Sequence, residues 1–243
     1  GNEDQRSRYL PGLGSGELKA AYALTEPSSG SDANSGKTKA VLSEDGKHYI
    51  LNGQKMWITN AGFADVFTVF AKIDDDKNLS AFIVDGDSEG LTLNAEEKKL
   101  GIKGSSTRQV FFSNVKVPVE NLLSDRGNGF KIAVNILNIG RIKLGAAAIG
   151  GGKQSITQSV NYANEREQFG RSISNYGAIQ HKLAQQAILT WINETATYRA
   201  GQDIENCIDS FIAGGMDPEE AKLKGVASYA VECAILKVFG SEA

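Results

Sequence analysis

The sequence predicts an α+β protein in which an antiparallel β-barrel domain is followed by an incomplete antiparallel helical bundle. Strand-length apolar runs dominate residues 18–127, and a helical period replaces them in residues 128–243. No alternation of strand and helix patterns occurs among the strand-like runs, which favours an antiparallel β domain over a parallel sheet. The boundary between the two parts falls within residues 117–130.

Five runs in the first part are rich in Val, Ile, Phe and Tyr and are separated by Gly, Asp, Asn and Ser, as is typical of strands. They are residues 20–25, 48–59, 65–73, 79–85 and 108–117. Asp45-Gly46 and the acidic cluster of residues 74–78 have the composition of hairpin turns. We interpret the cluster as a solvated turn rather than a metal site, because no second group of ligands accompanies it. No metal is therefore expected.

Three helices are expected after residue 127. The first begins near Asn128-Gly129 and contains several glycines, whose low helix propensity is most easily offset where another helix packs closely. The second covers about residues 176–206. The third opens at Asp217-Pro218, where Asp suits the N-cap and Pro the first turn, and it continues to about Val238. Their Gly-rich and Ala-rich faces need a further helical partner, so the bundle is predicted to be incomplete.

Composition excludes several classes of protein. The formal net charge is −3, and acidic and basic residues are interspersed, which argues against nucleic acid or an anionic membrane as the partner but leaves a small anionic ligand open. Cys207 and Cys233 lack metal-ligand spacing and indicate buried free thiols in a reducing compartment. No apolar run is expected to span a bilayer, and the first ten residues lack the apolar stretch of a signal peptide.

The first segment that could carry chemistry is AYALTEPSSGSD, residues 21–32. A strand ends near Thr25, Pro27 stiffens the turn, and the serines that follow expose hydroxyl and backbone N–H groups. Such a turn can hold a polar or phosphorylated ligand. Taken alone, it is better explained as a plain serine-rich turn.

The second segment is QKMWITNAG, residues 54–62. Trp57, followed two residues later by Thr59 at a strand end, can stack on a planar ring while the hydroxyl binds the polar edge of that ring. Periodicity alone favours the other interpretation, in which Trp57 belongs to the core.

Together, TEPSSGSD and, about thirty residues later, NGQKMWITNAG closely resemble the paired signature of the acyl-CoA dehydrogenase family. The resemblance continues through KKLGIKGSSTRQVFFSNVKVP, GFKIAVNILNIGR and NEREQFGRSISNYGAIQHKLA, and it covers nearly the whole chain. The segments ILNIGR and KVFGSEA are most similar to the very-long-chain branch of that family.

The resemblance implies an FAD-dependent enzyme that dehydrogenates fatty acyl-CoA thioesters between their α and β carbons. It assigns residues 1–17 to the end of an N-terminal helical domain, residues 18–127 to a middle β-barrel that binds flavin and acyl-CoA, and residues 128–243 to a truncated C-terminal helical domain. The resemblance leaves two alternatives open, namely an acyl-CoA oxidase and a non-catalytic binding or assembly protein with this fold.

The resemblance also implies where the ligands bind. Thr59 would donate toward the flavin N5, and Trp57 and Ile58 would flank the flavin ring. The turn at Arg166 would reach the FAD of a neighbouring subunit, and Arg suits a diphosphate because its fork can bind two oxygens. The implied cofactor-binding residues are Tyr22, Leu24, Thr25, Ser31, Trp57, Ile58, Thr59, Arg166, Gln168, Phe169, Ile179 and Gln180. The implied acyl-CoA-binding residues are Ser31, Asn138 and Arg141, although for Arg141 a structural pairing is an equal alternative.

Partners and location follow from the same resemblance. Acyl-CoA is the expected substrate, electron-transfer flavoprotein the expected electron acceptor, and a homodimer or homotetramer the expected assembly. No nucleic acid or membrane span is expected. The location would be cytoplasmic in a bacterium and the mitochondrial matrix in a eukaryote.

The expected reaction needs a carboxylate base. Some branches of the family place this Glu directly before the helix arginine, where the present chain has Gly140. Other branches place it beyond the position that matches Ala243. Glu165, Glu167 and Glu242 are not assigned this role, so no catalytic residue is predicted and the chain alone is expected to be inactive.

Overall fold

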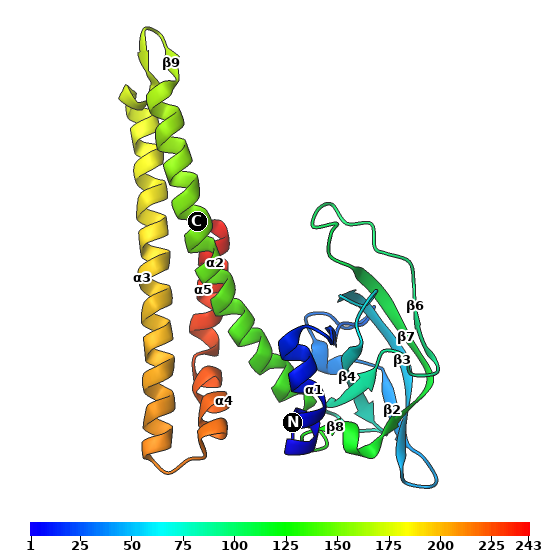
Figure 1. Ribbon diagram of the computed structural model, residues 1–243. Coiled ribbons are helices and arrows are strands. Elements are labelled where there is room, and N and C mark those ends of the chain that lie inside the picture. The colour runs from blue at the N-terminus through cyan, green and yellow to red at the C-terminus, as the bar shows by residue number, and fades with distance from the viewer. The chain divides into compact units, whose positions relative to one another are not determined.

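The computed structural model describes residues 1–243, which divide into two units, Gly1–Ala133 and Val134–Ala243. Helix α2 (Gly129–Glu165) begins in the first unit and continues into the second (Figure 1). The first unit also contains helix α1 (Glu3–Ser15) and the short 3-10 turns η1 (Ala33–Ser35) and η2 (Val119–Asn121). The side chain of Asn2 caps α1 by accepting a hydrogen bond from the backbone N–H of Gln5 at 2.8 Å.

One eight-stranded sheet forms the frame of the first unit. Its strands are β1 (Ala20–Ala23), β2 (Lys39–Leu42), β3 (His48–Thr59), β4 (Val66–Ile73), β5 (Ser80–Asp85), β6 (Leu91–Leu93), β7 (Thr107–Pro118) and β8 (Leu122–Leu123). The five predicted strands correspond to β1, β3, β4, β5 and β7, whereas the sequence patterns did not indicate β2, β6 and β8. The order along the sheet is β6-β7-β3-β2-β4-β5-β8, and β1 pairs with β4.

The sheet is not closed into a barrel, so the predicted barrel is not confirmed. The prediction of a purely antiparallel sheet is wrong, because β1 and β2 both pair in parallel with β4, at residues 66–69 and 72–73 of that strand. Parallel neighbours require a crossover connection, and here other strands form it instead of a helix. The chain therefore shows no βαβ pattern although two of its strand pairs are parallel.

Strands β4 and β5 are buried on both faces. Phe67 and Phe82 belong to the larger apolar cluster of the unit, whereas Phe70 and Ala81, on the same two strands, belong to a second cluster that also contains Ala133 of α2. A strand with apolar neighbours on both sides needs apolar residues at successive positions, which explains the continuous runs VFTVFAKI and SAFIVD.

Both predicted hairpin turns are confirmed. Asp45-Gly46 joins the antiparallel strands β2 and β3, and Gly46 has a φ of 69°, a conformation that favours glycine. The acidic cluster of residues 74–78 joins β4 to β5. Arg126 binds this cluster, with its Nε 2.6 Å from Asp76 and an Nη 3.3 Å from Asp74. The hydrogen bond from Arg126 lowers the pKa of Asp76, so a cationic side chain of this chain balances the cluster.

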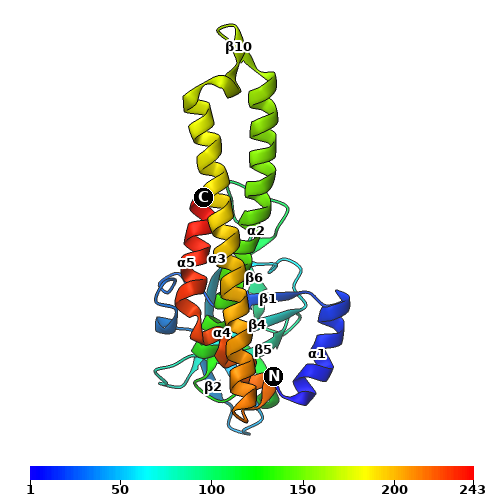
Figure 2. The same ribbon diagram turned by 90° about the vertical axis from the view of Figure 1, so that its left-hand side faces the viewer.

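The second unit consists of helices. They are the main part of α2, then α3 (Gly177–Ala213), α4 (Pro218–Ser228) and α5 (Ala230–Glu242). Between α2 and α3 lie a two-stranded hairpin, β9 (Glu167–Gln168) and β10 (Arg171–Ser172), and the 3-10 turn η3 (Ile173–Asn175). Figures 1 and 2 both show this hairpin at the end of the unit where α2 and α3 are joined.

The predicted starts of the helices agree with the structure better than the predicted ends. Asp217 caps α4 by accepting from the backbone N–H groups of Glu219 and Glu220, and Pro218 occupies the first turn, as predicted. The expected single third helix is wrong, because the chain breaks at Tyr229 (φ −108°, ψ 28°) into α4 and α5. Helix α3 also extends past the predicted end near residue 206, and the apolar cluster of Ile208 with Ala221 and Cys233 accounts for the extra turns.

The prediction that no segment could span a bilayer is not supported for α2. This helix has the length and composition of a membrane-crossing helix, with a mean hydropathy of 1.4 over its most apolar window, of which 22% is buried. Core helices of helical domains pass the same test, so this finding is weak evidence for a membrane.

The glycines of α2 that follow its first residue, Gly129, fall into two groups. At Gly145 and Gly152, an added Cβ would lie 3.4 Å and 2.7 Å from the hydroxyls of Thr197 and Thr190 on α3. At Gly140, Gly150 and Gly151, an added Cβ would meet no atom within 4 Å. The expectation of close helix packing therefore holds for the first group only.

This difference predicts opposite effects of two neighbouring substitutions. Gly150→Ala should stabilise the chain by about 0.5–1 kcal/mol, because Ala has the higher helix propensity. Gly152→Ala should destabilise it, because the new methyl meets Thr190, whose β-branched side chain has little rotamer freedom in a helix. Thermal unfolding followed by circular dichroism measures both changes, and equal stabilisation by the two variants would contradict the close packing of α2 on α3.

Candidate functional site

The two motif segments, thirty residues apart in the sequence, lie side by side in the first unit. The backbone N–H of Met56 on β3 donates to the carbonyl of Thr25 at 2.8 Å. The neighbouring Lys55 ammonium donates to the carbonyl of Leu24 at 3.2 Å and to the carboxylate of Glu26 at 2.7 Å. The structure thus brings the end of β1 and the final part of β3 together, so that residues 22–25 and 57–59 can serve one site.

A β-bulge turns Trp57 away from the core. The pairing of β3 with β7 shifts between Lys55, opposite Val110, and Ile58, opposite Arg108, so β3 contains one extra residue there. Trp57 has a φ of 58°, which is rare for an aromatic residue, and 61% of it is exposed. The interpretation of Trp57 as a core residue is wrong, and the exposed indole is free to stack on a planar ligand.

Tyr22 on β1 has a buried hydroxyl without a hydrogen-bond partner. Its ring packs edge-on against Phe70 with 5.0 Å between the ring centroids, and burial raises the pKa of its phenol. Buried hydroxyls nearly always have partners, so this oxygen marks a place where a ligand can supply one. The hydroxyls of Thr25 and of the exposed Thr59 likewise have no side-chain hydrogen bond within the chain.

The serine-rich loop uses its hydroxyls in two ways. The buried Ser29 donates to the carbonyls of Asp32 and Ala33, and Ser35 also donates to the carbonyl of Asp32, so both fold the loop upon itself. Ser31 is exposed and makes no hydrogen bond, which leaves its hydroxyl available to a ligand. Leu24 and Ile58 are buried, at 8% and 2% exposure, and support the site from beneath.

The sequence interpretation missed a buried ion pair that joins the two motif segments. Glu26 and Lys55 have side chains that are only 4% and 0% exposed, and their charged atoms lie 2.7 Å apart. Burial opposes ionisation of Glu26, but the Lys55 ammonium and the N–H groups of Lys37 and Thr38 outweigh it and lower the pKa of Glu26. The sequence does contain an indication of this burial. Lys55 lies four residues after the inward-facing Leu51, so in a strand, where side chains alternate between faces, both point to the same side.

A second carboxylate, Glu96, supports the turn that ends the second motif. It accepts hydrogen bonds from the Ser106 hydroxyl, the Thr107 N–H and the Arg108 guanidinium at 2.7 to 2.8 Å. Ser106 in turn accepts from the N–H of Gly62 at 3.0 Å, and a Cβ at Gly62 would lie 2.5 Å from the same hydroxyl. These bonds lower the pKa of Glu96 to about 2, with the largest effects from Ser106 and Arg108.

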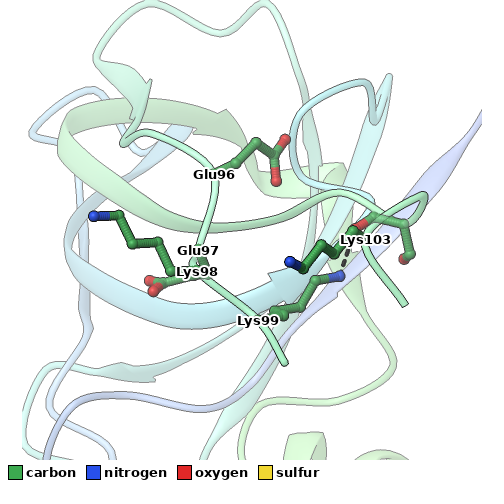
Figure 3. Close-up of a pocket in the computed structure, with 6 residues that line it drawn as sticks. Glu96, Glu97, Lys98, Lys99 and Lys103 are labelled. Atoms are coloured by element: carbon green, nitrogen blue, oxygen red, sulfur yellow. Dashed lines mark hydrogen bonds between the residues drawn. The ribbon is translucent and has the colours of Figure 1, made fainter. Parts of the chain in front are cut away.

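A cavity of about 440 Å³ lies beside this network. Figure 3 shows its lining, which mixes carboxylates with ammonium groups. The lining residues are Glu96, Glu97, Lys98, Lys99, Lys103 and Ser105. Lys99 donates to the carbonyls of Ile102 and Ser105 and so holds together the loop of residues 99–105, part of which lines the cavity.

In the second unit, the predicted cofactor-contacting turn is the β9–β10 hairpin. Phe169 lies at its tip with a φ of 53° and is 94% exposed. The Tyr176 hydroxyl donates to the carbonyl of Gln168 at 2.8 Å, and the Arg171 guanidinium stacks on the Tyr176 ring. Arg166 is exposed, and its side chain makes no hydrogen bond or ion pair, so its guanidinium is available to a ligand or another chain.

The remaining predicted residues lie on two helices. Ile179 and Gln180 are in the first turn of α3, where the Gln180 amide donates to the carbonyl of Ser174. On α2, Arg141 donates to the amide oxygen of Asn138 at 2.9 Å, and Asn138 is buried. The structure therefore gives Arg141 a neutral hydrogen-bond partner.

Comparison with known proteins identifies the family. The profile of the acyl-CoA dehydrogenase middle domain matches residues 21–115, and the profile of the acyl-CoA dehydrogenase C-terminal domain matches residues 127–243. This chain therefore belongs to the acyl-CoA dehydrogenase family. The sequence interpretation reached the same family from its motifs.

Individual relatives are similar over the whole chain. It is 50% identical over 242 residues to a "Probable acyl-CoA dehydrogenase" of Bacillus subtilis, covering 100% of this chain and 41% of that protein. It is 44% identical over 251 residues to the human mitochondrial very long-chain specific acyl-CoA dehydrogenase, covering 100% and 36%. The crystal structure of an acyl-CoA dehydrogenase complexed with FAD from Bacillus anthracis has a TM-score of 0.90 at 49% identity, covering 100% and 41%. The chain thus spans less than half the length of these relatives.

The Glu96 network predicts a dependence of stability on pH. The pKa of Glu96 falls from its ordinary 4.5 to about 2 in the folded chain. A lowered folded-state pKa adds stability that is fully present above pH 4.5 and is lost as the pH falls toward 2. The wild-type chain should therefore exceed Glu96→Gln in urea stability near pH 6, and the difference should shrink below pH 4.5. A difference that stays constant down to pH 3 would rule out this role of the Glu96 charge.

Proposed function

We propose that this chain is part of an FAD-dependent acyl-CoA dehydrogenase that introduces a double bond between the α and β carbons of a fatty acyl-CoA thioester. The observation that carries the proposal is the meeting of the two motif segments, which presents the exposed indole of Trp57 beside hydroxyls that lack partners. Membership of the family and the similarity to an FAD-complexed relative support it.

The residues of the first unit fit the flavin ring of FAD. The indole of Trp57 offers an aromatic face, and the hydroxyls of Tyr22 and Thr59 offer donors to the polar edge of the ring. The unpartnered oxygen of Tyr22 is the specific sign of fit, since a ligand atom there would complete its hydrogen bonding. Thr25 and Ser31 would add donors, while Leu24 and Ile58 would support the ring from within.

FAD, when bound, accepts the two electrons that the substrate loses. The protein has to bind the thioester, exclude water and remove the α proton with a carboxylate. We assign Ser31, Asn138 and Arg141 to acyl-CoA binding, and we assign none of the carboxylates described here as the base. Gly140, which stands where some family members have that base, has room for a side chain but carries none.

Arg166, Gln168, Phe169, Ile179 and Gln180 are proposed to bind FAD in a neighbouring subunit of a homodimer or homotetramer. The exposure of Arg166 and Phe169 on a projecting hairpin supports this assignment. Electron-transfer flavoprotein is the proposed electron acceptor. The curated relatives include bacterial and mitochondrial proteins, in line with a cytoplasmic or mitochondrial location.

The proposed reaction is tested in the intact protein by mixing it anaerobically with acyl-CoA of different chain lengths. Rapid bleaching of the flavin, followed by slow reoxidation in air, is the expected result. Fast reoxidation by oxygen would indicate an oxidase instead. A lack of bleaching with every acyl-CoA would contradict the assigned reaction and favour a non-catalytic role.

Thr59→Val in the intact protein should weaken FAD binding by about 0.5–1.5 kcal/mol, because it removes one hydrogen bond to the flavin edge. The matched control is Thr92→Val, the same change at an exposed strand position of β6. FAD titration and the flavin reduction potential report the effect. Equal affinity and potential in both variants would exclude Thr59 from the site.

Arg166 should act on the FAD of another subunit. Each proposed site combines Thr59 of one subunit with Arg166 of its neighbour. An oligomer of Arg166→Ala subunits therefore lacks Arg166 in every site, and an oligomer of Thr59→Val subunits lacks the Thr59 hydroxyl in every site. Mixing them should restore some intact sites, measured as tight FAD binding above that of either variant alone. If subunits exchange and no site recovers, both residues serve the cofactor of their own subunit.

A further inference from the structure

Lys55 and Glu26 form an ion pair that is buried beneath the candidate flavin site and that the proposed reaction does not use. All three donors of the Lys55 ammonium are engaged, with the carbonyls of Leu24 at 3.2 Å and Phe70 at 2.6 Å and with Glu26 at 2.7 Å. The pair therefore has few bonding positions left for a ligand. We therefore look for its role in the backbone segments that it binds.

Glu26 closes the serine-rich loop at both ends. It stands at the start of the loop, and its carboxylate accepts from the N–H of Lys37 at 2.6 Å and from the N–H of Thr38 at 3.0 Å, where the chain leaves the loop. An added Cβ at Gly36 would lie 3.0 Å from the same carboxylate, so the loop exit packs tightly on Glu26. The two ends of the loop of residues 27–36, which includes Ser31, are thereby held at one charged group.

Lys55 ties this loop to the bulge that exposes Trp57. It is the last residue of β3 before the pairing with β7 shifts, and the next residue, Met56, donates to the carbonyl of Thr25. The ammonium also binds Phe70 on β4, so β3, β4 and the segment directly after β1 meet at this atom. A displacement of the Lys55 head group would alter the loop and the bulge together.

Stability alone does not explain the pair. Taking two charges out of water is expensive, and replacing a buried ion pair by apolar groups of similar size is often neutral or stabilising. What apolar groups cannot reproduce is the directed set of bonds from one ammonium and one carboxylate to four backbone groups on three separate segments. The ion pair is therefore suited to fixing the positions of these backbone segments relative to one another.

We propose that the Glu26–Lys55 pair is a positioning device, which sets the serine-rich loop and the Trp57 bulge at the mutual geometry that FAD binding requires. This inference rests on the proposed function, because the ligand of both segments is taken to be FAD. Glu26 and Lys55 act through the segments that they hold and are positioning residues.

The test compares the single variants Glu26→Gln and Lys55→Met with the double variant Glu26→Gln/Lys55→Met in the intact protein. Each single variant leaves one buried group unpaired and should lower the unfolding temperature. The double variant removes both charges and should regain most of that loss. Its dissociation constant for FAD should nevertheless stay at least tenfold above wild type, and its flavin reduction potential should stay shifted. If the double variant recovers FAD affinity and potential together with stability, the pair is structural only and the proposal is overturned.

A second measurement does not depend on FAD. Amide hydrogen exchange of residues 27–36 and 56–59 in the apo protein should be faster in the double variant than in wild type. Val117→Ala, which shortens a buried side chain on β7 and should lower stability, is the matched control and should leave the exchange of these residues and the FAD affinity unchanged. Unchanged exchange in the double variant overturns the proposal even where FAD binding is weak.

FAD binding and hydrogen exchange test different properties of the protein. Failure of the wild-type protein to bind FAD would count against the proposed function, whereas the exchange measurement would still decide whether the pair orders the loop and the bulge. Should the single variants not fold, Glu26→Asp takes their place. It keeps the charge but shortens the reach to Lys37 and Thr38, and normal exchange of residues 27–36 in this variant would also overturn the proposal.

Discussion

The β-bulge at Met56 and Trp57 is the constraint on which the candidate site depends. In a regular strand, Lys55 and Trp57 would share one face and Ile58 would lie on the other. The extra residue reverses this order, so that Lys55 and Ile58 are both buried while Trp57 faces outward. The bulge thus allows one short segment to supply both a buried charge for internal bonding and an exposed aromatic ring for a ligand.

Much of the fold could be predicted where the signals are local. Hairpin turns at Asp45-Gly46 and residues 74–78, five strands and the cap at Asp217 follow from neighbouring residues. The parallel pairing of β1 with β4 joins segments more than forty residues apart, and no local pattern encodes it. The break at Tyr229 is similar, since a helical pattern continues through it and the tertiary packing of α4 and α5 decides where it ends.

The candidate site was predictable mainly through the family motifs. Periodicity placed Trp57 in the core, and only the paired motifs indicated a position beside a flavin ring, because a bulge leaves no clear mark in the sequence. Glu26 and Lys55 lie inside these motifs and still escaped notice, since charged residues near a ligand site are usually read as exposed. Their role depends on backbone partners from three separate segments, which a sequence alone does not bring together.

The pairing of Glu26 with Lys55 also determines the chemistry that the site can offer. Two opposite charges held 2.7 Å apart present little net charge to their surroundings, so recognition beside Trp57 is left to neutral groups. The hydroxyls of Tyr22, Thr25 and Thr59 are such groups, and each can donate or accept. Neutral donors of this kind match the carbonyl and nitrogen edge of a flavin ring better than a diphosphate, whose negative charge calls for a guanidinium such as that of Arg166. The neutral hydroxyls of the two motifs therefore suit the ring of the proposed cofactor, and the charged guanidinium of the hairpin suits its diphosphate.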